Sequence, residues 1–498
     1  MSSRMLLRAA AIAAIAVLAC AGLSSGCIIY LNPLCTDQIR NGEETDIDCG
    51  GTCGKCDLGG RCGADADCDE GTCKGGTCAP LPCANGVQDG EETDVDCGGD
   101  TCRKCAGGRT CEAATDCFNG MCVGTPKACD ELKVVSFGPA VSFPSGNKAY
   151  ILLSSDFNGD GSIDLAAGNE LDSEMRVFLN NGAGTFQRVA TAFPTGDYST
   201  GGVIADFNKD GIPDVVTADY HGNSVSILLG INNGMGKGTG SLAPKSTFPT
   251  IEGAETSNLA VGDLNRDGNL DVIATNPQTS SVSRFMGRGD GTLDPAINVP
   301  VGIEGSAEPY SVAIGDFNLD GNNDVAIANV RNGTLIVRLG NGDGTFQDEV
   351  PYVEGGTPPY ILITHDVDVD GKLDLVCANR ASNDVSVLLG RGDGTFRKAV
   401  VSRTGPEDGP DTGPYAITVA DFNRDGVPDV ATPNYLSSTA SVLLGIGNGG
   451  FEEPIDVGTT GETSYGIVAA DLNGDGKIDL AISNAISNDV TVKLSTAQ

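Results

Sequence analysis

The sequence contains no tryptophan, only two histidines and few aromatic residues of any kind. Phe, Trp and Tyr together make up 5% of the 498 residues, whereas glycine alone contributes 70. This composition argues against a helical bundle and favours many short strands joined by tight turns. Two histidines also leave few candidates for a histidine-based catalytic site.

Basic residues are also in short supply. Lys and Arg number 31 against 67 Asp and Glu, so the formal net charge at pH 7 is −36. A chain with this charge repels nucleic acid and anionic membrane surfaces, and it attracts divalent cations. We therefore do not expect a nucleic-acid partner.

Long hydrophobic runs are missing beyond the N-terminal segment. Residues 9–19 (AAAIAAIAVLA) are apolar and follow Arg4 and Arg8, but this run is too short to cross a bilayer as a helix of the mature protein. The pattern predicts a secretory signal peptide over residues 1–26, and hence an oxidising compartment for the rest of the chain.

Two cysteines near the end of this segment compete as a lipidation site, because the region resembles the lipobox of bacterial lipoproteins. VLAC, which ends at Cys20, has the usual apolar residue three places before the cysteine. SSGC, which ends at Cys27, has the small residues expected just before it. Cysteine parity favours Cys27, because Cys20 then leaves with the signal. The resemblance implies a secreted protein anchored by lipid at the bacterial outer membrane or cell surface. Secretion without a lipid is the alternative.

Cysteines are almost absent after residue 129, where only Cys377 is found. Residues 35–78 and 83–129 form a tandem repeat with eight cysteines in each copy. Each copy has too few apolar residues to build a core, so disulfides must hold it together. Eight cysteines allow many pairings, and the sequence does not choose among them.

Two cysteine pairs have the spacing of redox or zinc-binding motifs, Cys53 with Cys56 in CGKC and Cys102 with Cys105 in CRKC. No histidine lies nearby and the compartment favours disulfides, so a structural role is preferred. The two modules resemble cysteine-rich repeats of secreted myxobacterial lipoproteins, which implies a stiff spacer or interaction stalk.

One acidic stretch occurs seven times after residue 155. DFNGDGSID returns as DFNKDGIPD, DLNRDGNLD, DFNLDGNND, DVDVDGKLD, DFNRDGVPD and DLNGDGKID, at intervals of 50, 57, 53, 50, 55 and 50 residues. A period near 50 residues is typical of stacked or radial repeats.

Each copy places oxygen ligands at loop positions 1, 3, 5 and 9 and a backbone carbonyl at position 7, with glycine at position 6 for the chain reversal. Ca²⁺ prefers such an oxygen-rich shell. Two carboxylates roughly 5 Å apart repel by about 3 kcal/mol, and a divalent cation reverses this repulsion. The sequence therefore predicts up to seven calcium ions. Their ligands are Asp156, Asn158, Asp160, Ser162, Asp164; Asp206, Asn208, Asp210, Ile212, Asp214; Asp263, Asn265, Asp267, Asn269, Asp271; Asp316, Asn318, Asp320, Asn322, Asp324; Asp366, Asp368, Asp370, Lys372, Asp374; Asp421, Asn423, Asp425, Val427, Asp429; Asp471, Asn473, Asp475, Lys477 and Asp479.

The EF-hand loop begins in the same way but needs Glu at position 12 and a following helix. Position 12 is never acidic here, and the residues that follow, such as DVVTAD and DVIATN, are short and β-branched. The loop therefore joins two strands. A solvated turn rich in Asp and Asn, without metal, is the alternative.

A second pattern follows each loop by about 20 residues, an alternating apolar strand and a Gly/Asn/Asp turn that ends in Phe, as in VRLGNGDGTFQ. Each repeat thus reads as four antiparallel strands, which form a propeller blade. The motifs resemble the FG-GAP or VCBS repeat family, similar to the head propeller of integrin α subunits, over residues 134–498. The resemblance implies an all-β, seven-bladed propeller with calcium in its first hairpin loops. Asp368 departs from the usual Asn.

The last repeat lacks its fourth strand, and the segment before the first repeat supplies one. VVSFGPAVSFPSG, residues 134–146, reads as a strand without the three that should precede it. We expect it to complete the seventh blade and so remove an exposed sheet edge.

Five tyrosines share one position, six residues before the first Asp of their loop, where Thr200 and Ser257 stand in the other two repeats. A propeller places them around one mouth of the central channel. They either pack between inner strands or form a stacking surface for a sugar or peptide. These residues are Tyr150, Tyr310, Tyr360, Tyr415 and Tyr465.

The function expected from the sequence is recognition or adhesion, by a secreted, calcium-binding propeller that binds a protein or a glycan as a monomer. No catalytic triad or open metal site is recognisable, so we do not expect an enzyme. The alternative is a polysaccharide lyase that uses the face around His221, in DYHGN; His365 precedes a metal loop and is expected to be structural.

Overall fold

The computed structural model describes residues 135–302, 307–353, 359–405, 412–458 and 460–496, together with scattered residues between 56 and 129. The chain divides into two compact units, Met1–Asn85 and Gly86–Gln498. The predicted signal peptide and the lipidation candidates Cys20 and Cys27 lie outside the described residues. No helix in the described part is long and apolar enough to span a membrane.

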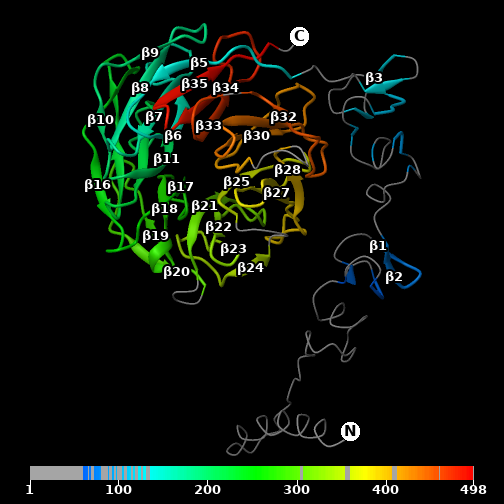
Figure 1. The fold of residues 1–498 in the computed structure, drawn as a ribbon. Coiled ribbons are helices and arrows are strands. Elements are labelled where there is room, and N and C mark those ends of the chain that lie inside the picture. Colours follow the sequence, from blue (N-terminus) through cyan, green and yellow to red (C-terminus); the bar gives the residue numbers. More distant parts are fainter. Residues whose placement is uncertain are drawn as a thin grey trace, which may run out of the picture. The chain divides into compact units, whose positions relative to one another are not determined.

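Seven antiparallel sheets form a ring, each running from an inner to an outer strand (Figure 1). This confirms the all-β, seven-bladed propeller. Blades 1 to 3 are β6 (Ala149–Ser155), β7 (Asp164–Asn169), β8 (Glu174–Asn180) and β10 (Phe193–Pro194), with β9 (Phe186–Arg188) also on β8; β11 (Ser199–Ala205), β12 (Asp214–Asp219), β13 (Ser224–Leu228) and β16 (Ser246–Pro249); and β17 (Leu259–Gly262), β18 (Asp271–Asn276), β19 (Ser281–Phe285) and β20 (Ile297–Pro300).

Blades 4 to 7 repeat the same order. They are β21 (Pro309–Gly315), β22 (Asp324–Asn329), β23 (Thr334–Arg338) and β24 (Val350–Val353); β25 (Ile361–His365), β26 (Asp374–Asn379), β27 (Asp384–Leu388) and β28 (Val400–Arg403); β29 (Thr418–Ala420), β30 (Asp429–Asn434), β31 (Thr439–Leu443) and β32 (Ile455–Asp456); and β33 (Ser464–Ala470), β34 (Asp479–Asn484), β35 (Asp489–Lys493) and β5 (Val141–Pro144).

Two further elements interrupt this regularity. A hairpin of β14 (Gly230–Asn232) and β15 (Gly238–Leu242) extends blade 2. A single 3-10 turn, η4 (Pro277–Thr279), follows β18 in blade 3.

The second strand of every blade is buried along its whole length, from DLAAGN in blade 1 to DLAISN in blade 7. Such strands are covered on both faces, which explains their nearly continuous apolar sequence. Seven hydrophobic clusters lie between successive blades, and each contains the apolar side chain at position 2 of one acidic loop. These side chains are Phe157, Phe207, Leu264, Phe317, Val367, Phe422 and Leu472.

The ring is closed by the segment that precedes the first repeat, as the sequence predicts. β5 pairs antiparallel with β35, with Val141 opposite Val492 and Pro144 opposite Asp489. Figure 1 shows this early strand beside the C-terminal ones. The ring of Phe143 also packs edge-on against Phe186, 5.4 Å between centroids. Strands from both ends of the propeller therefore complete blade 7.

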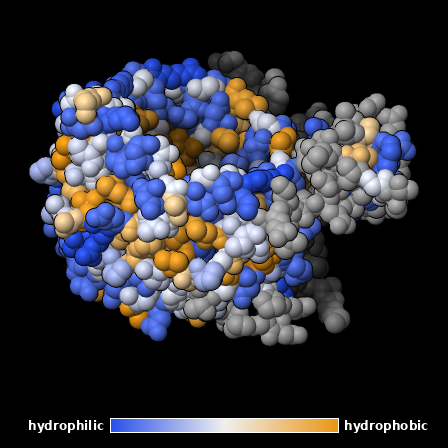
Figure 2. Space-filling view, turned by 90° about the horizontal axis from the view of Figure 1, so that it is seen from above, coloured by the Kyte–Doolittle hydropathy of each residue, from blue (hydrophilic) through white to orange (hydrophobic). Residues whose placement is uncertain are grey.

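The surface of the propeller in Figure 2 is largely hydrophilic, interrupted by small groups of apolar side chains. Several of the exposed ones stand on outer strands, including Val141, Ile297, Val350 and Val400. Single apolar residues of this kind are normal on a soluble surface.

Disulfides hold the cysteine modules, as expected. In the first module Cys62 pairs with Cys73 and Cys68 with Cys78. In the second, Cys97 pairs with Cys105 and Cys111 with Cys122. Cys105 of CRKC is therefore cross-linked to a cysteine outside the motif, which removes the redox interpretation of that pair.

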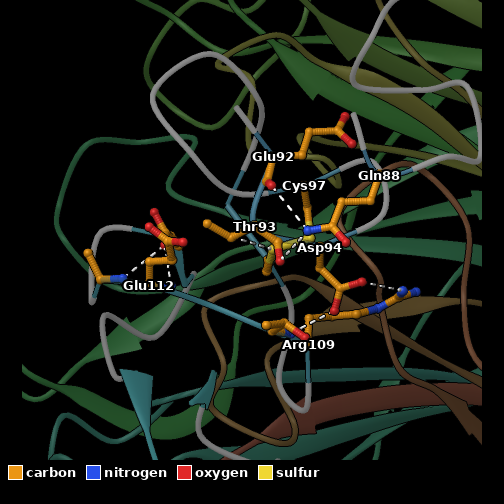
Figure 3. The surroundings of a disulfide bond; sticks show 11 residues. Gln88, Glu92, Thr93, Asp94, Cys97, Arg109 and Glu112 are labelled. Carbon is orange, nitrogen blue, oxygen red and sulfur yellow. Dashed lines mark hydrogen bonds and ion pairs between the residues drawn. A yellow bond between two sulfur atoms is a disulfide. The ribbon is translucent and has the colours of Figure 1, made fainter. Parts of the chain in front are cut away.

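Polar contacts support the Cys97–Cys105 bridge (Figure 3). The carboxylate of Asp94 accepts a 2.6 Å hydrogen bond from the backbone N–H of Thr110 and lies 3.8 Å from the Arg109 guanidinium. Gln88 donates to the carbonyls of Glu92 and Thr93. The bonds orient the chain around the bridge, while the disulfides stand in for the apolar core that the module lacks.

Deleting residues 134–146 should lower the melting temperature of the propeller by at least about 5 °C, because blade 7 loses its outer strand and β35 becomes an unpaired edge. Differential scanning calorimetry of the shortened protein against the full chain measures the effect. An unchanged melting temperature would show that this strand does not secure the ring.

Candidate functional site

The seven acidic loops share one backbone conformation. The carboxylate at position 1 accepts hydrogen bonds from the N–H groups at positions 5 and 6, as Asp206 does from Asp210 at 3.1 Å and from Gly211 at 2.9 Å. Position 6 is glycine with φ between 78° and 93° in every loop. This left-handed conformation is the reason for glycine there.

Position 4 is also left-handed, which the sequence did not reveal. Its φ lies between 58° and 73° in all seven loops, and only two of these residues are glycine. Val369 occupies this position at φ 60° although its branched Cβ disfavours that region. The hydrogen bonds of the neighbouring position-1 carboxylate, Asp366, hold the turn in place.

The carboxylate at position 9 joins the loop to the rest of its blade. It is fully buried in every loop, and it accepts one hydrogen bond from the N–H of position 2 and another from a residue 16 places further on. In blade 5, Asp374 accepts from Val367 and from Gly390, both at 2.8 Å. Burial raises the pKa of Asp374 to about 7, and of Asp429 in blade 6 to about 8, with further contributions from nearby loop carboxylates.

The acidic loop of blade 5 gathers three carboxylates that could hold a divalent cation. Carboxylate oxygens of Asp366, Asp368 and Asp370 lie within 4.8 Å of one another. Among the described residues, Oδ1 of Asp368 is buried without a hydrogen-bond partner, and so is Oδ2 of Asp425. Asp425 is only 2% exposed. Buried carboxylate oxygens without donors are unfavourable unless a cation compensates them.

Loops 2, 3 and 4 also contact the glycine turn of the following blade. The N–H of Gly394, in the hairpin turn of blade 5, donates to the carbonyl of Phe317 in loop 4 at 3.0 Å. Gly344 and Gly291 make the equivalent bonds one and two blades earlier, to Leu264 and Phe207. The GDG turns and the acidic loops therefore lie at the same end of the ring, as the strand order requires.

Position 4 adds side-chain contacts in the same direction around the ring. Lys209 in loop 2 donates to Asn269 in loop 3 at 2.7 Å. Arg266 in loop 3 donates to the carbonyl of Asp320 in loop 4 at 2.9 Å, and Arg424 in loop 6 donates to the carbonyl of Gly476 in loop 7. Neighbouring loops are thus linked from blade to blade.

The five tyrosines singled out above are brought into mutual contact. Hydroxyl groups of Tyr310, Tyr360 and Tyr415 lie 2.8, 3.0 and 3.2 Å from one another, and Tyr150 also bonds to Tyr415. The ring of Tyr465 lies 4.4 Å from Tyr150 and 4.5 Å from Tyr415. Burial raises the pKa of Tyr150, Tyr360 and Tyr415, so these phenols are neutral at physiological pH.

Two residues that the sequence did not point to complete this tyrosine cluster. Tyr435 follows β30 and lies 5.2 Å from the Tyr465 ring. Arg380 follows β26 and places its guanidinium carbon 4.3 Å from the centroid of Tyr435, 5.4 Å from Tyr415 and 5.6 Å from Tyr360. Both occupy turns that vary between repeats, so no periodic signal marks them.

His221 lies in a second group of aromatic side chains, on blade 2. It is exposed and stacks on Tyr198 at 4.3 Å, and Tyr220 lies 5.3 Å away. Lys148 donates to the Tyr198 hydroxyl at 3.1 Å and forms an ion pair with the buried Glu170. His365 is the last residue of β25 and is exposed to solvent. The burial of part of its imidazole lowers its pKa.

Comparisons with known proteins agree with this architecture. Models of the FG-GAP-like repeat match residues 156–217, 206–274, 263–327, 366–432 and 434–482, which is over half of the chain. The chain therefore belongs to the FG-GAP repeat family. A search of the curated proteins finds no match.

Solved structures resemble the fold at low identity. Virginiamycin B lyase from Staphylococcus aureus is 11% identical with a TM-score of 0.50, covering 71% of this chain and 98% of the lyase. An Agrocybe aegerita lectin that recognises non-reducing terminal N-acetylglucosamine is 19% identical with a TM-score of 0.45, covering 68% and 86% of the two chains. At these identities the likeness concerns the fold alone.

Gly394→Ala should destabilise the propeller by roughly 1–3 kcal/mol, because Gly394 has φ 82° and a Cβ there would lie 2.8 Å from Cδ2 of Leu339 in the preceding blade. Denaturant unfolding measures the change. Gly211→Ala, with a similar φ of 79° but nothing within 4 Å of its Cβ, separates the backbone strain from the clash. Equal effects of the two substitutions would contradict the inter-blade contact.

Proposed function

We propose that this protein is a secreted recognition or adhesion module whose propeller is stabilised by calcium. The observation that carries the calcium proposal is a pair of buried carboxylate oxygens without a hydrogen-bond donor in two of the acidic loops, Oδ1 of Asp368 and Oδ2 of Asp425. The seven loops offer oxygen at positions 1, 3, 5 and 9 and the carbonyl at position 7. Calcium bound there would supply charge compensation and rigidity.

The calcium proposed here is structural. Its ligands would come from the loop itself, and the position-9 carboxylates, such as Asp374, are fully buried. Extracellular calcium modules bind with dissociation constants of about 10⁻⁴ to 10⁻³ M. When the calcium concentration is ten times the dissociation constant, each bound ion adds about 1.4 kcal/mol to the free energy of unfolding. Seven sites would then add about 10 kcal/mol, which is comparable to the stability of a typical domain.

Removing calcium should therefore lower the melting temperature by more than about 10 °C. Calorimetry of the full chain with excess Ca²⁺ and with a chelator tests this, alongside elemental analysis of bound metal. Asp366→Asn should reduce the bound calcium by about one ion per chain. Asp348→Asn, at an exposed position outside the loops, is the matched control. An unchanged melting temperature and no retained metal would reject the proposal.

Lipid anchoring through Cys27 is part of the same proposal, with the disulfide modules as the stalk that carries the propeller. The modules support it because disulfides persist in oxidising compartments. In this arrangement only the lipid contacts the membrane. Cys20 as the lipidated residue, or release without a lipid, are the alternatives.

Recognition of a protein or glycan is proposed from the propeller's two faces. The acidic loops occupy one face, and the variable turns that carry Tyr435, Arg380 and His221 occupy the other, where a ligand meets side chains that differ from blade to blade. Variable loops on a rigid scaffold are a common way to build a binding surface.

A polysaccharide lyase is the second candidate, because His221 and Tyr198 of blade 2 lie together with Lys148 at the start of blade 1. The two functions separate in one experiment. The full chain with calcium should capture ligand in a glycan and protein binding screen without cleaving acidic polysaccharides. Product formation that disappears in His221→Ala would favour the lyase, and neither capture nor cleavage would remove both.

A further inference from the structure

We propose that Arg380 is a carboxylate-binding residue, and that the tyrosine cluster around it forms a subsite for a uronic-acid-type saccharide. The proposal rests on the recognition function above and names its site and ligand class. It starts from a contrast among three cations on this face of the propeller, Arg380, Lys148 and Arg331.

Two of these cations are paired with carboxylates. Lys148 forms its ion pair with Glu170, and Arg331 lies 3.7 Å from Glu308. The guanidinium of Arg380 has no hydrogen bond or ion pair to any residue in the described part of the chain, and its contacts there are the three tyrosine rings. In a chain of net charge −36, a partly buried cation that has no anionic partner among the described residues stands out.

The tyrosines fix this guanidinium without neutralising it. Stacking on aromatic faces occupies the plane of the group and leaves its N–H edges free to donate. The Tyr360 and Tyr415 hydroxyls cannot act as counter-ions, because their pKa values are raised by burial and both are engaged with Tyr310.

The backbone that carries Arg380 is also held firmly. The preceding residue, Asn379, is buried, and its amide donates to Asp384 at 2.8 Å and to Ser386 at 2.9 Å. The N–H of Asn383 donates to the carbonyl of Asn379 at 3.1 Å and closes the turn. A preorganised guanidinium loses little entropy when it binds a carboxylate through two parallel bonds.

The surrounding rings favour a saccharide as the bearer of that carboxylate. Tyr435 and Tyr465 are partly exposed and lie beside the guanidinium, and flat aromatic rings stack well on pyranose faces. A cationic ligand is disfavoured, because the guanidinium of Arg380 already lies against the tyrosine rings that would otherwise bind a cation. A peptide with a free carboxylate is the competing class that the experiment must exclude.

The test uses the full chain in excess Ca²⁺ and methyl β-D-glucuronoside as the probe, with methyl β-D-glucoside as its uncharged match. Since the chain has no tryptophan, tyrosine fluorescence reports on the cluster directly, and saturation-transfer NMR identifies the bound face of the sugar. We expect the glucuronoside to bind with a millimolar dissociation constant, and the glucoside at least roughly tenfold more weakly.

Arg380→Gln should weaken glucuronoside binding by roughly tenfold or more, and Arg380→Lys should recover little of it because an ammonium lacks the planar fork. Arg331→Gln, on the neighbouring blade, is the control and should bind normally. Near-UV circular dichroism and the melting temperature check that each variant is folded; if Arg380→Gln is not, the Lys variant carries the comparison.

Several results would overturn the proposal. These are no glucuronoside binding up to about 20 mM, equal binding of the glucoside, unchanged binding by folded Arg380 variants, or tighter binding of N-acetyl-dialanine through its carboxylate. If the wild type still captures another ligand in the binding screen, and Arg380→Gln captures it equally well, the recognition function stands and only this site is rejected.

Discussion

The propeller depends on a fully buried carboxylate at the ninth position of every acidic loop. Each of these groups, such as Asp374, accepts two backbone N–H bonds and so joins the loop to the turn that follows the third strand of its own blade. Burial raises their pKa values, which shows that ionising them without compensation is costly. The geometry of the loops and the regularity of the blades both follow from placing this carboxylate in the interior.

The same loops explain why the blades form a ring rather than separate sheets. Position 2 packs an apolar side chain between blades in every loop. In loops 2, 3 and 4 its carbonyl also accepts a bond from the next blade's glycine turn, and in loops 2, 3 and 6 the side chain at position 4 bonds to the next loop. Phe317 and Gly394 illustrate this arrangement between blades 4 and 5. One nine-residue motif therefore sets both the fold of a blade and its contact with its neighbour.

Much of this architecture could be predicted from the sequence because it repeats. The spacing of the acidic loops fixes the number of blades, and the unpaired strand before residue 146 indicates the closure that β5 makes with β35. The left-handed conformation at position 4 was not predictable, because Val369 and Leu319 give no local signal for it. Arg380 and Tyr435 were missed for another reason: the residue at their position differs between most repeats, and only the folded ring brings these two to the tyrosines.

The pairing of β5 with β35 has a mechanical consequence. Any tension that arrives through residues before 135 meets the hydrogen bonds of this strand pair and the Phe137–Ser495 bridge before it reaches the other blades. The strand pair that closes the ring is therefore also the first part of the propeller to bear a pulling force. The force that the propeller withstands from this side is set by these few hydrogen bonds.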